Sequence, residues 1–302
     1  MSPRPTAPPG LPAPGRCLVM GVVNVTPDSF SDGGAWFDSK RAIEQGVRLA
    51  EEGADIVDVG GESTRPGAQR VSADEELRRV GPVVRELARQ GVVVSVDTMR
   101  AEVAAFAVEA GARMVNDVSG GLTDSAMARL VAKSGVAYVL MHWRGHSHDM
   151  YRRAVYADVT AEVRDELRQR MASMIDEGVA PEQIVLDPGL GFAKSPERGH
   201  NWELLAHLDE FLGLGRPLLV AASRKRFIGR LLTDPYGEQR PFTDCDDATV
   251  AISALAAERG AWCVRVHDVR PNADAVRVAL AWGSGGAALT DGRADPIGRG
   301  AS

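Results

Sequence analysis

Hydrophobic and β-branched residues fall into short runs along the chain, and each run is followed by a segment in which apolar positions recur with helical spacing. We predict strands from the runs at residues 17–25, 56–59, 92–96, 114–118, 137–141, 184–186, 218–221 and 263–266. We predict helices from the segments between them, at residues 39–52, 73–90, 101–110, 125–133, 159–177, 201–211, 247–258 and 273–282.

Strict alternation of strands and helices predicts a parallel sheet with right-handed crossovers. Eight such units favour a sheet that closes on itself, so we predict an α/β fold, a TIM (β/α)8 barrel, as a single domain at residues 16–283. The alternative is an open doubly wound sheet, which usually has fewer strands and leaves two edges exposed. In a barrel, the functional site is built from the C-terminal ends of the strands and the loops that follow them.

Both ends of the chain lack this pattern. Residues 1–15 are rich in proline and lack the apolar core of a secretory signal, and residues 284–302 are rich in Gly, Ala, Asp and Arg. We expect both ends to be disordered tails. Three well-separated cysteines, Cys17, Cys245 and Cys263, show no metal-binding or redox spacing, so we expect reduced core thiols in a cytoplasmic protein.

The composition, with 44% hydrophobic residues, is ordinary for a globular protein with a sizeable core. The formal net charge is −6, and acidic and basic residues are interleaved along the chain. This charge pattern argues against nucleic acid or an anionic membrane as the main partner, although it leaves room for a local basic pocket. No apolar run approaches the roughly 20 residues of a membrane span.

Polar residues stand at the ends of most predicted strands, namely Asp97, Asn116, Asp187, Lys225 and Arg265. Because the C-terminal ends of parallel barrel strands meet at one mouth, we expect these side chains to converge. A lone Asp at such a position is often a structural hydrogen-bonding group, and Asp187 also begins an Asp-Pro-Gly turn. Burying several charges without partners costs several kcal/mol each, so they must be neutralised by one another or by a ligand.

Two glycine-containing loops follow the first two predicted strands, at residues 24–34 and 60–68. The second loop carries hydroxyls and an arginine, which suits a phosphate, although either loop is also compatible with a surface loop with helix-capping residues. Carboxylates and a carboxamide can pair with the edge of a flat heterocycle such as guanine or pterin, and Arg265 and His267 add an anion site. We therefore predict a barrel enzyme for a planar, nitrogen-rich ring that carries phosphate or diphosphate.

The chain resembles the dihydropteroate synthase family from residue 19 to about residue 282, through segments 24–33, 60–67, 187–194, 223–225 and 265–268. The resemblance implies a Mg²⁺-dependent condensation of 6-hydroxymethyl-7,8-dihydropterin diphosphate with p-aminobenzoate, which yields dihydropteroate and diphosphate. It implies these two small molecules as partners, with neither nucleic acid nor membrane. It also implies a homodimer built from outer barrel helices. Residues 247–258 are a candidate for this interface, although their apolar positions equally suit a face that packs on the barrel.

The resemblance also implies the roles of individual residues. Those implied for the pterin are Asp97, Asn116, Met141, Asp187, Phe192 and Lys225. Those implied for the chemistry itself are Asp97, Lys225 and Asp32. Those implied for the diphosphate are Thr64, Arg65, Arg265 and His267, and those implied for p-aminobenzoate are Phe30, Pro66 and Arg226. Asn24 is implied as the Mg²⁺ ligand.

Three features depart from the family pattern. Ala221 stands where glycine is usual, and Arg226 stands where a serine would contact the p-aminobenzoate carboxylate. Because arginine binds carboxylates well, we expect that contact to be retained. The loop at residues 143–150 lacks the usual family wording, which leaves its role open. Two rival functions are a pterin-binding methyltransferase of the same barrel superfamily, which has no use for a diphosphate site, and a non-catalytic pterin-binding paralogue.

Overall fold

Eight parallel strands alternate with helices, as the hydrophobic pattern predicts. The computed structural model describes residues 6–26, 34–62, 71–145 and 152–286. The strands are β1 (Leu18–Asn24), β2 (Ile56–Gly60), β3 (Val94–Asp97), β4 (Met114–Asp117), β5 (Ala137–Met141), β6 (Ile184–Asp187), β7 (Leu219–Val220) and β8 (Cys263–Val266). The helices are α1 (Gly34–Glu51), α2 (Ala73–Arg89), α3 (Ala101–Glu109), α4 (Met127–Ser134), α5 (Val159–Asp176), α6 (His200–Ala206), α7 (Leu208–Leu212), α8 (Arg226–Leu231), α9 (Asp246–Glu258) and α10 (Val269–Gly283), with short 3-10 helices η2 (Pro181–Gln183) and η3 (Phe242–Asp244).

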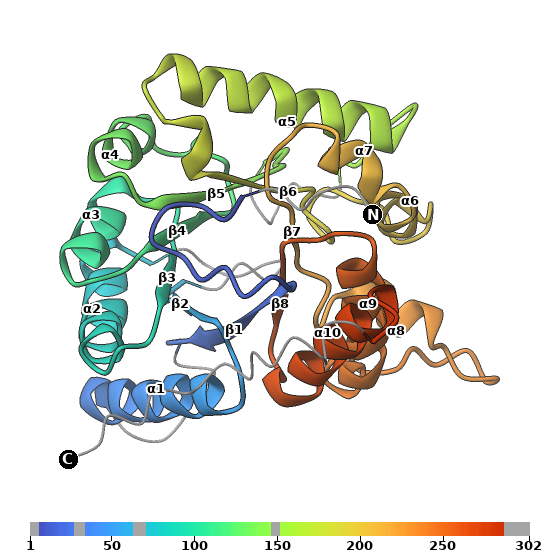
Figure 1. Cartoon of the computed structure of the whole chain (residues 1–302), viewed down its shortest axis with the longest axis horizontal. Helices are drawn as coiled ribbons and strands as arrows, with labels where there is room; N and C mark the ends of the chain where they lie inside the picture. Colours follow the sequence, from blue (N-terminus) through green and yellow to red (C-terminus); the bar gives the residue numbers. More distant parts are fainter. Residues whose placement is uncertain (1–5, 27–33, 63–70, 146–151, 287–302) are drawn as a thin grey trace.

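The strands form a ring in the middle of the molecule, and the helices surround it (Figure 1). Hydrogen-bonded neighbours follow the order β6-β5-β4-β3-β2-β1-β8-β7. The two ends of this sheet meet through a parallel bridge between Leu186 and Leu218, and the Leu186 amide donates to the Pro217 carbonyl at 2.8 Å. The sheet is therefore closed, and the predicted TIM barrel is confirmed.

Alternate residues of the strands face two different cores. One core lies between the strands and the helices. The other fills the barrel and consists of Leu18, Met20, Ile56, Met114, Ala137, Val139, Val185, Leu219, Ala221, Trp262 and Cys263. Two residues further along β2, β4, β6 and β8, the same inward face becomes polar, with Asp58, Asn116, Asp187 and Arg265. The barrel interior is thus apolar at its N-terminal end and polar at its C-terminal mouth.

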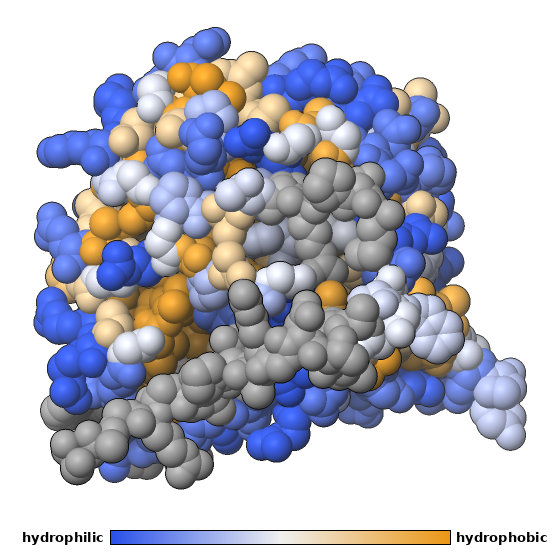
Figure 2. Space-filling view, viewed as in Figure 1, coloured by the Kyte–Doolittle hydropathy of each residue, from blue (hydrophilic) through white to orange (hydrophobic). Residues whose placement is uncertain are grey.

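The helices turn their apolar stripes onto the strands. Helix α2 is an example, because Val80, Val84 and Leu87 recur at helical spacing and are buried. Its start is set by Ser72, whose side chain accepts a hydrogen bond from the Glu75 amide at 3.2 Å. Hydrophilic residues accordingly make up most of the outline of the molecule, with hydrophobic residues showing in the gaps between them (Figure 2).

Four helices differ from the prediction, and the first of them, α1, begins at Gly34, before its predicted start. The single helix predicted at residues 201–211 is divided into α6 and α7, because His207 leaves the helical region with φ −117° and ψ 42°. Helix α10 begins at Val269, before the predicted start, and Pro271 falls in its first turn, where the missing N–H is not needed. The hydrophobic pattern does not predict α8, which has only 6 residues and is too short to show a period.

Residues 6–15, expected to belong to a disordered tail, are placed against the N-terminal end of the barrel. Pro8 is buried, and Leu11 packs against the interior cluster. Next to them, the Arg16 guanidinium donates two hydrogen bonds to the Asp55 carboxylate, at 2.7 and 2.8 Å. Burial of these apolar side chains explains why the stretch is held. The remainder of the two predicted tails, residues 1–5 and 287–302, lies outside the described residues.

The cysteines bear out the expectation of core thiols, since Cys17, Cys245 and Cys263 are buried and carry reduced thiols. Burial raises the pKa of the Cys263 thiol well above its usual range, which makes it a poor nucleophile. Among the helices that the structure describes, none has the length and hydropathy needed to cross a membrane.

Candidate active site

Six of the predicted site residues lie in the strands themselves, on the face that points into the barrel, and these are Asn24, Asp97, Asn116, Met141, Asp187 and Arg265. The strand register places Asp97 beside Asn116 and Met141 beside Asp187. Lys225 follows β7 at the start of α8, and His267 follows β8. The structure therefore brings these predicted residues to one mouth.

Arg265 is the centre of a buried hydrogen-bond network. Its Nε donates to Asp58 Oδ2 at 2.7 Å, and its Nη2 donates to Asp97 Oδ2 at 2.8 Å. The Asn116 carboxamide donates to the same Asp58 oxygen at 2.8 Å. One guanidinium thus joins β8 to β2 and β3, and the shared carboxylate extends the network to β4.

Sequence reasoning missed Asp58, which is fully buried. It lies inside a short apolar run, where the pattern predicts only a core strand. The available signal was its position two residues after Ile56, on the same inward face as the other polar strand ends.

Burial controls the charges at the mouth. Burial raises the pKa of Asp97 to about 7; the attraction of Arg265 opposes this shift, and the nearby Asp58 carboxylate adds to it. Burial also raises the pKa of Asp187, against the attraction of Lys225. For Lys225, burial lowers the pKa to about 8, and Asp187 opposes that shift. The mouth therefore holds groups that exchange protons near neutral pH.

The loop after β6 shapes the wall beside Lys225. The Lys225 ammonium donates to the Leu190 carbonyl and lies 5.0 Å from the centroid of the Phe192 ring. Gly189 and Gly191 both have positive φ, at 71° and 79°. A Cβ at the first would collide with the His142 carbonyl oxygen, and one at the second would lie 3.0 Å from Lys225 Cδ. This wall therefore requires glycine at both positions.

The loop after β7 carries Ser223 and Arg224, and it contacts His267, which follows β8. The Ser223 hydroxyl and Nδ1 of His267 lie 2.9 Å apart, which orients the ring of this predicted anion ligand. Arg224 has φ 56°, which is strained for a residue with a side chain, and its guanidinium donates to Asp246 at 2.8 Å. Arg226, predicted to contact p-aminobenzoate, begins α8 with an exposed side chain.

The loop after β2 is anchored at both of its described ends. Arg100 donates to Glu62 at 3.0 Å and to the Val71 carbonyl at 2.5 Å, and it also binds the buried Glu76. The Val71 amide donates to Glu62 at 3.2 Å. Further predicted site residues lie outside the described residues, namely Phe30, Asp32, Thr64, Arg65 and Pro66.

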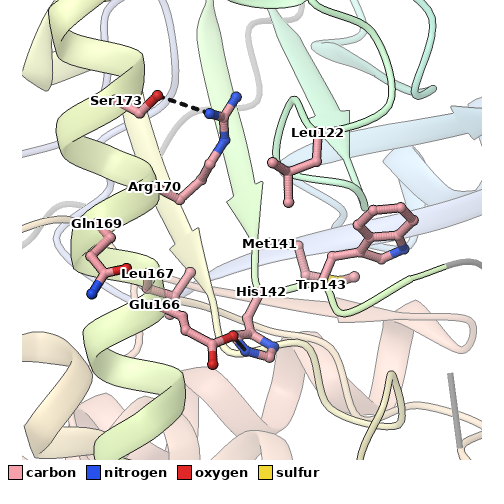
Figure 3. Close-up of a pocket in the computed structure, with 9 residues that line it drawn as sticks. All are labelled: Leu122, Met141, His142, Trp143, Glu166, Leu167, Gln169, Arg170 and Ser173. Atoms are coloured by element: carbon pink, nitrogen blue, oxygen red, sulfur yellow. Dashed lines mark hydrogen bonds and ion pairs between the residues drawn. The ribbon is translucent and has the colours of Figure 1, made fainter. Parts of the chain in front are cut away.

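A cavity of about 290 Å³ lies beside the mouth, between α5 and the ends of β4 and β5 (Figure 3). It is lined by Leu122, Met141, His142, Trp143, Glu166, Leu167, Gln169, Arg170 and Ser173. Five of these residues belong to α5, and none belongs to the Arg265 network; Met141 is the one predicted site residue among them.

Fold and site together define a (β/α)8-barrel enzyme whose mouth presents carboxylate, carboxamide and cationic groups to a polar ligand. Comparison with known proteins supplies the family. The family described as pterin binding enzyme matches residues 20–267. A dihydropteroate synthase of Mycobacterium leprae is 54% identical over 278 residues, which is 92% of this chain and 97% of that protein.

Two solved structures of dihydropteroate synthase from Xanthomonas albilineans are similar to this barrel. The structure with 4-aminobenzoic acid has 45% identity and a TM-score of 0.81, over 88% of this chain and 93% of the other. The structure in complex with 7,8-dihydropteroate has 41% identity and a TM-score of 0.80, over 93% of this chain and 98% of the other. This chain belongs to the dihydropteroate synthases of the pterin-binding enzyme family, as its motifs predict.

The Arg265 network predicts a large effect of Asp58→Asn. The carboxamide keeps the shape of the side chain and one acceptor oxygen, but it removes one of the two negative charges that face Arg265. We expect the free energy of unfolding to fall by about 1.5–3 kcal/mol, the usual contribution of a hydrogen bond to a charged group. Urea denaturation of the wild type and the variant measures this loss in the free energy of unfolding.

Ser95→Ala is the matched control, because Ser95 pairs with Asp58 in the strand register. Its buried hydroxyl has no hydrogen-bond partner among the described residues, so its removal should change stability by less than about 1 kcal/mol. Equal losses in the two variants would contradict the central place of Asp58.

The raised pKa of Asp97 predicts that the stability of the protein depends on pH. Its pKa is about 7 in the folded protein and has an ordinary value of 3.8 without the fold, so the folded state binds the proton more tightly. This contribution to stability is complete below about pH 4 and is lost as the pH rises through about 7. Asp97→Asn removes the titrating group, so the Tm of the wild type minus that of the variant should fall between about pH 4 and 8. Scanning calorimetry measures both Tm values, and a Tm difference that stays constant with pH would disprove the raised pKa of Asp97.

Proposed function

We propose that this chain joins 6-hydroxymethyl-7,8-dihydropterin diphosphate to p-aminobenzoate, with Mg²⁺ bound, and forms 7,8-dihydropteroate and diphosphate. Family membership supports this activity, as do the ligands of the related structures, 4-aminobenzoic acid and 7,8-dihydropteroate. The observation that carries the proposal for this chain is the charged mouth organised around Arg265.

The order of strands sorts the candidate residues into two arcs. The groups proposed for the pterin ring come from β3 to β6 and the loop after β7, and those proposed for the diphosphate come from β8, β1 and the loop after β2. A ligand with a flat ring and an anionic tail therefore meets suitable chemistry on each side of the mouth.

The pterin arc combines acceptors and donors. An ionised Asp187 accepts N–H groups of the ring edge, the Asn116 carboxamide both donates and accepts, and the Lys225 ammonium only donates. Phe192 and Met141 add apolar contacts for the faces of the ring. Hydrogen bonds in a buried site are strong, so this arc selects a ring with a matching pattern of donors and acceptors.

The anion arc is organised before any ligand binds. Arg265 uses Nε and Nη2 for Asp58 and Asp97, which leaves Nη1, unpartnered among the described residues, for a diphosphate oxygen. The His267 ring is oriented by Ser223. Donors that are already in place stabilise the charge of a leaving diphosphate without reorganisation.

The residues present fit Mg²⁺. Asn24 ends β1 at the mouth and offers a carboxamide oxygen, a hard ligand. Within the described ranges, no group of three or more His, Cys, Asp and Glu could hold a metal ion. A site with few protein ligands suits Mg²⁺, which often takes its other ligands from phosphates and water. When bound, the ion supplies positive charge that neutralises the diphosphate.

We infer that the C–O bond to the diphosphate breaks before the new C–N bond forms. The bonding electron pair leaves with the diphosphate, and the resulting methylene cation is delocalised into the pterin ring. We assign stabilisation of this cation to the Asp97 carboxylate. The amine of p-aminobenzoate then attacks the methylene carbon and loses a proton, which completes the product.

Product formation tests the proposed reaction. Purified protein with the pterin diphosphate and Mg²⁺ should release diphosphate and form dihydropteroate when p-aminobenzoate is present. Lys225→Met should lower kcat/KM on the order of 100-fold, because the ring loses a buried, charged donor. Lys133→Met is the control, since Lys133 is exposed on α4. Binding of the pterin without diphosphate release would contradict the proposal and favour methyl transfer or a non-catalytic role.

We also propose that the chain forms a homodimer through α9 and α10. These packed helices expose Leu255, Val278 and Trp282, whose exposed fractions are 63%, 61% and 82%. Large apolar side chains on neighbouring outer helices are typical of the core of a protein interface.

Light scattering coupled to size-exclusion chromatography tests the dimer. The wild type should have about twice the chain mass of 32.2 kDa, and Leu255→Lys should shift it towards the single-chain mass, since burying an unpaired charge in an interface is costly. Val155→Lys, at a residue 67% exposed in the segment that precedes α5, should leave the mass unchanged. A monomeric wild type at micromolar concentration would refute the dimer.

A further inference from the structure

Lys194 is fully buried, and its ammonium has a complete set of partners. Its Nζ lies 3.0 Å from the Phe192 carbonyl oxygen, 3.3 Å from that of Gly189 and 3.0 Å from Nδ1 of His142. An ammonium has three protons and no acceptor, so these three partners use all of its capacity. Burial lowers the pKa of Lys194 to about 7, and the Asp187 carboxylate opposes that shift.

His142 connects Lys194 to helix α5. Because Nδ1 accepts from Lys194, Nε2 carries the ring proton and donates to Glu166 at 2.8 Å. Burial lowers the pKa of His142 to about 4, with Lys194 adding to the shift, so the ring stays neutral. Arg144 donates to the same carboxylate at 3.1 Å. Figure 3 shows Glu166 reaching from α5 to His142 at the end of β5.

The loop after β6 lies between this anchor and the pterin arc. On one side, two of its carbonyl oxygens bind Lys194. On the other side, its Leu190 carbonyl accepts from Lys225, and its Gly189 amide donates to Asp187 at 2.7 Å. A displacement of the loop would therefore move both charged groups.

Backbone strain marks the same loop. Ala193, directly before Lys194, has φ 48°. A residue with a side chain is strained in this region and persists there only where its surroundings hold it. The Tyr156 hydroxyl donates to the Ala193 carbonyl at 2.9 Å, and the Tyr156 ring lies 3.9 Å below the Arg144 guanidinium. Tyr156 thus binds the strained residue, and Arg144 packs on the far side of that contact, against the Tyr156 ring.

We infer that Lys194 is a positioning residue for the pterin site, whose buried ammonium fastens the loop after β6 to His142 and so holds Asp187 and Lys225 in ring-binding geometry. The inference rests on the proposed function. Lys194 acts through the loop, and Glu166 and Arg144 complete the anchor on the outer side of the barrel.

Steady-state kinetics of Lys194→Met tests the positioning role, with rates normalised to folded protein by near-UV circular dichroism. Methionine keeps the length of the side chain but has no donor. We expect KM for the pterin diphosphate to rise on the order of tenfold or more, because small misplacements of binding groups are costly. KM for p-aminobenzoate should change by less than about twofold, since the displaced groups belong to the pterin arc. Lys133→Met is the control and should match the wild type in both constants.

Tyr156→Phe is the milder second variant, because it removes one hydroxyl from the anchor and keeps the ring. Its pterin KM should rise a few-fold in the same direction. If Lys194→Met does not fold, Tyr156→Phe serves as the test of the positioning role. An unchanged KM of Tyr156→Phe for the pterin diphosphate would then overturn the inference. A folded Lys194→Met with lower Tm but wild-type pterin KM would also overturn it, because that is the signature of a purely structural lysine.

Calorimetric titration with a pterin that lacks the diphosphate separates this inference from the proposed reaction. Weaker binding by Lys194→Met than by Lys133→Met supports positioning even if the wild type forms no dihydropteroate, in which case only the proposed reaction fails. Equal binding by the two variants, with an active wild type, overturns the positioning role alone.

Discussion

One guanidinium shared by two buried carboxylates is the constraint on which the mouth of this barrel depends. Arg265 reaches from β8 to Asp58 on β2 and to Asp97 on β3, and its positive charge offsets the cost of burying both carboxylates. Burial raises the pKa of Asp97 against the attraction of Arg265, and the second carboxylate, Asp58, adds to that shift. The same network that stabilises the closed barrel therefore sets the electrostatics offered to a ligand.

The loop after β6 is the second constraint, because it separates an inner set of charges from an outer one. Inside it, Lys225 and Asp187 face the mouth. Outside it, Lys194 and His142 connect the loop to α5. Glycines allow the chain to pass between these two layers, and the strained conformation of Ala193 is maintained by contacts on the outer side. The loop thus connects the groups at the mouth to residues that lie on its outer side.

Prediction from the sequence was successful where local pattern and topology suffice. Period-2 alternation places Asn116 and Asp187 on the same face as the apolar residues two positions earlier, and parallel strands bring their ends to one mouth. It failed for Asp58, because a single acidic residue in an apolar run does not reveal its partner. It also failed to assign Lys194, which looks like an ordinary loop lysine until the loop folds back over His142.

The sequence by itself determined the order of strands and helices, the barrel and the kinds of polar group at the strand ends, since these follow from periodicity and from the motifs that resemble the family. Only the tertiary structure decided which of these groups neutralise one another. Arg265 binds carboxylates that are 207 and 168 residues away along the chain. Closure of the barrel brings its guanidinium nitrogens to hydrogen-bonding distance, about 3 Å, from the carboxylate oxygens. Pairing depends on such distances and on burial, neither of which is a property of a local stretch of sequence.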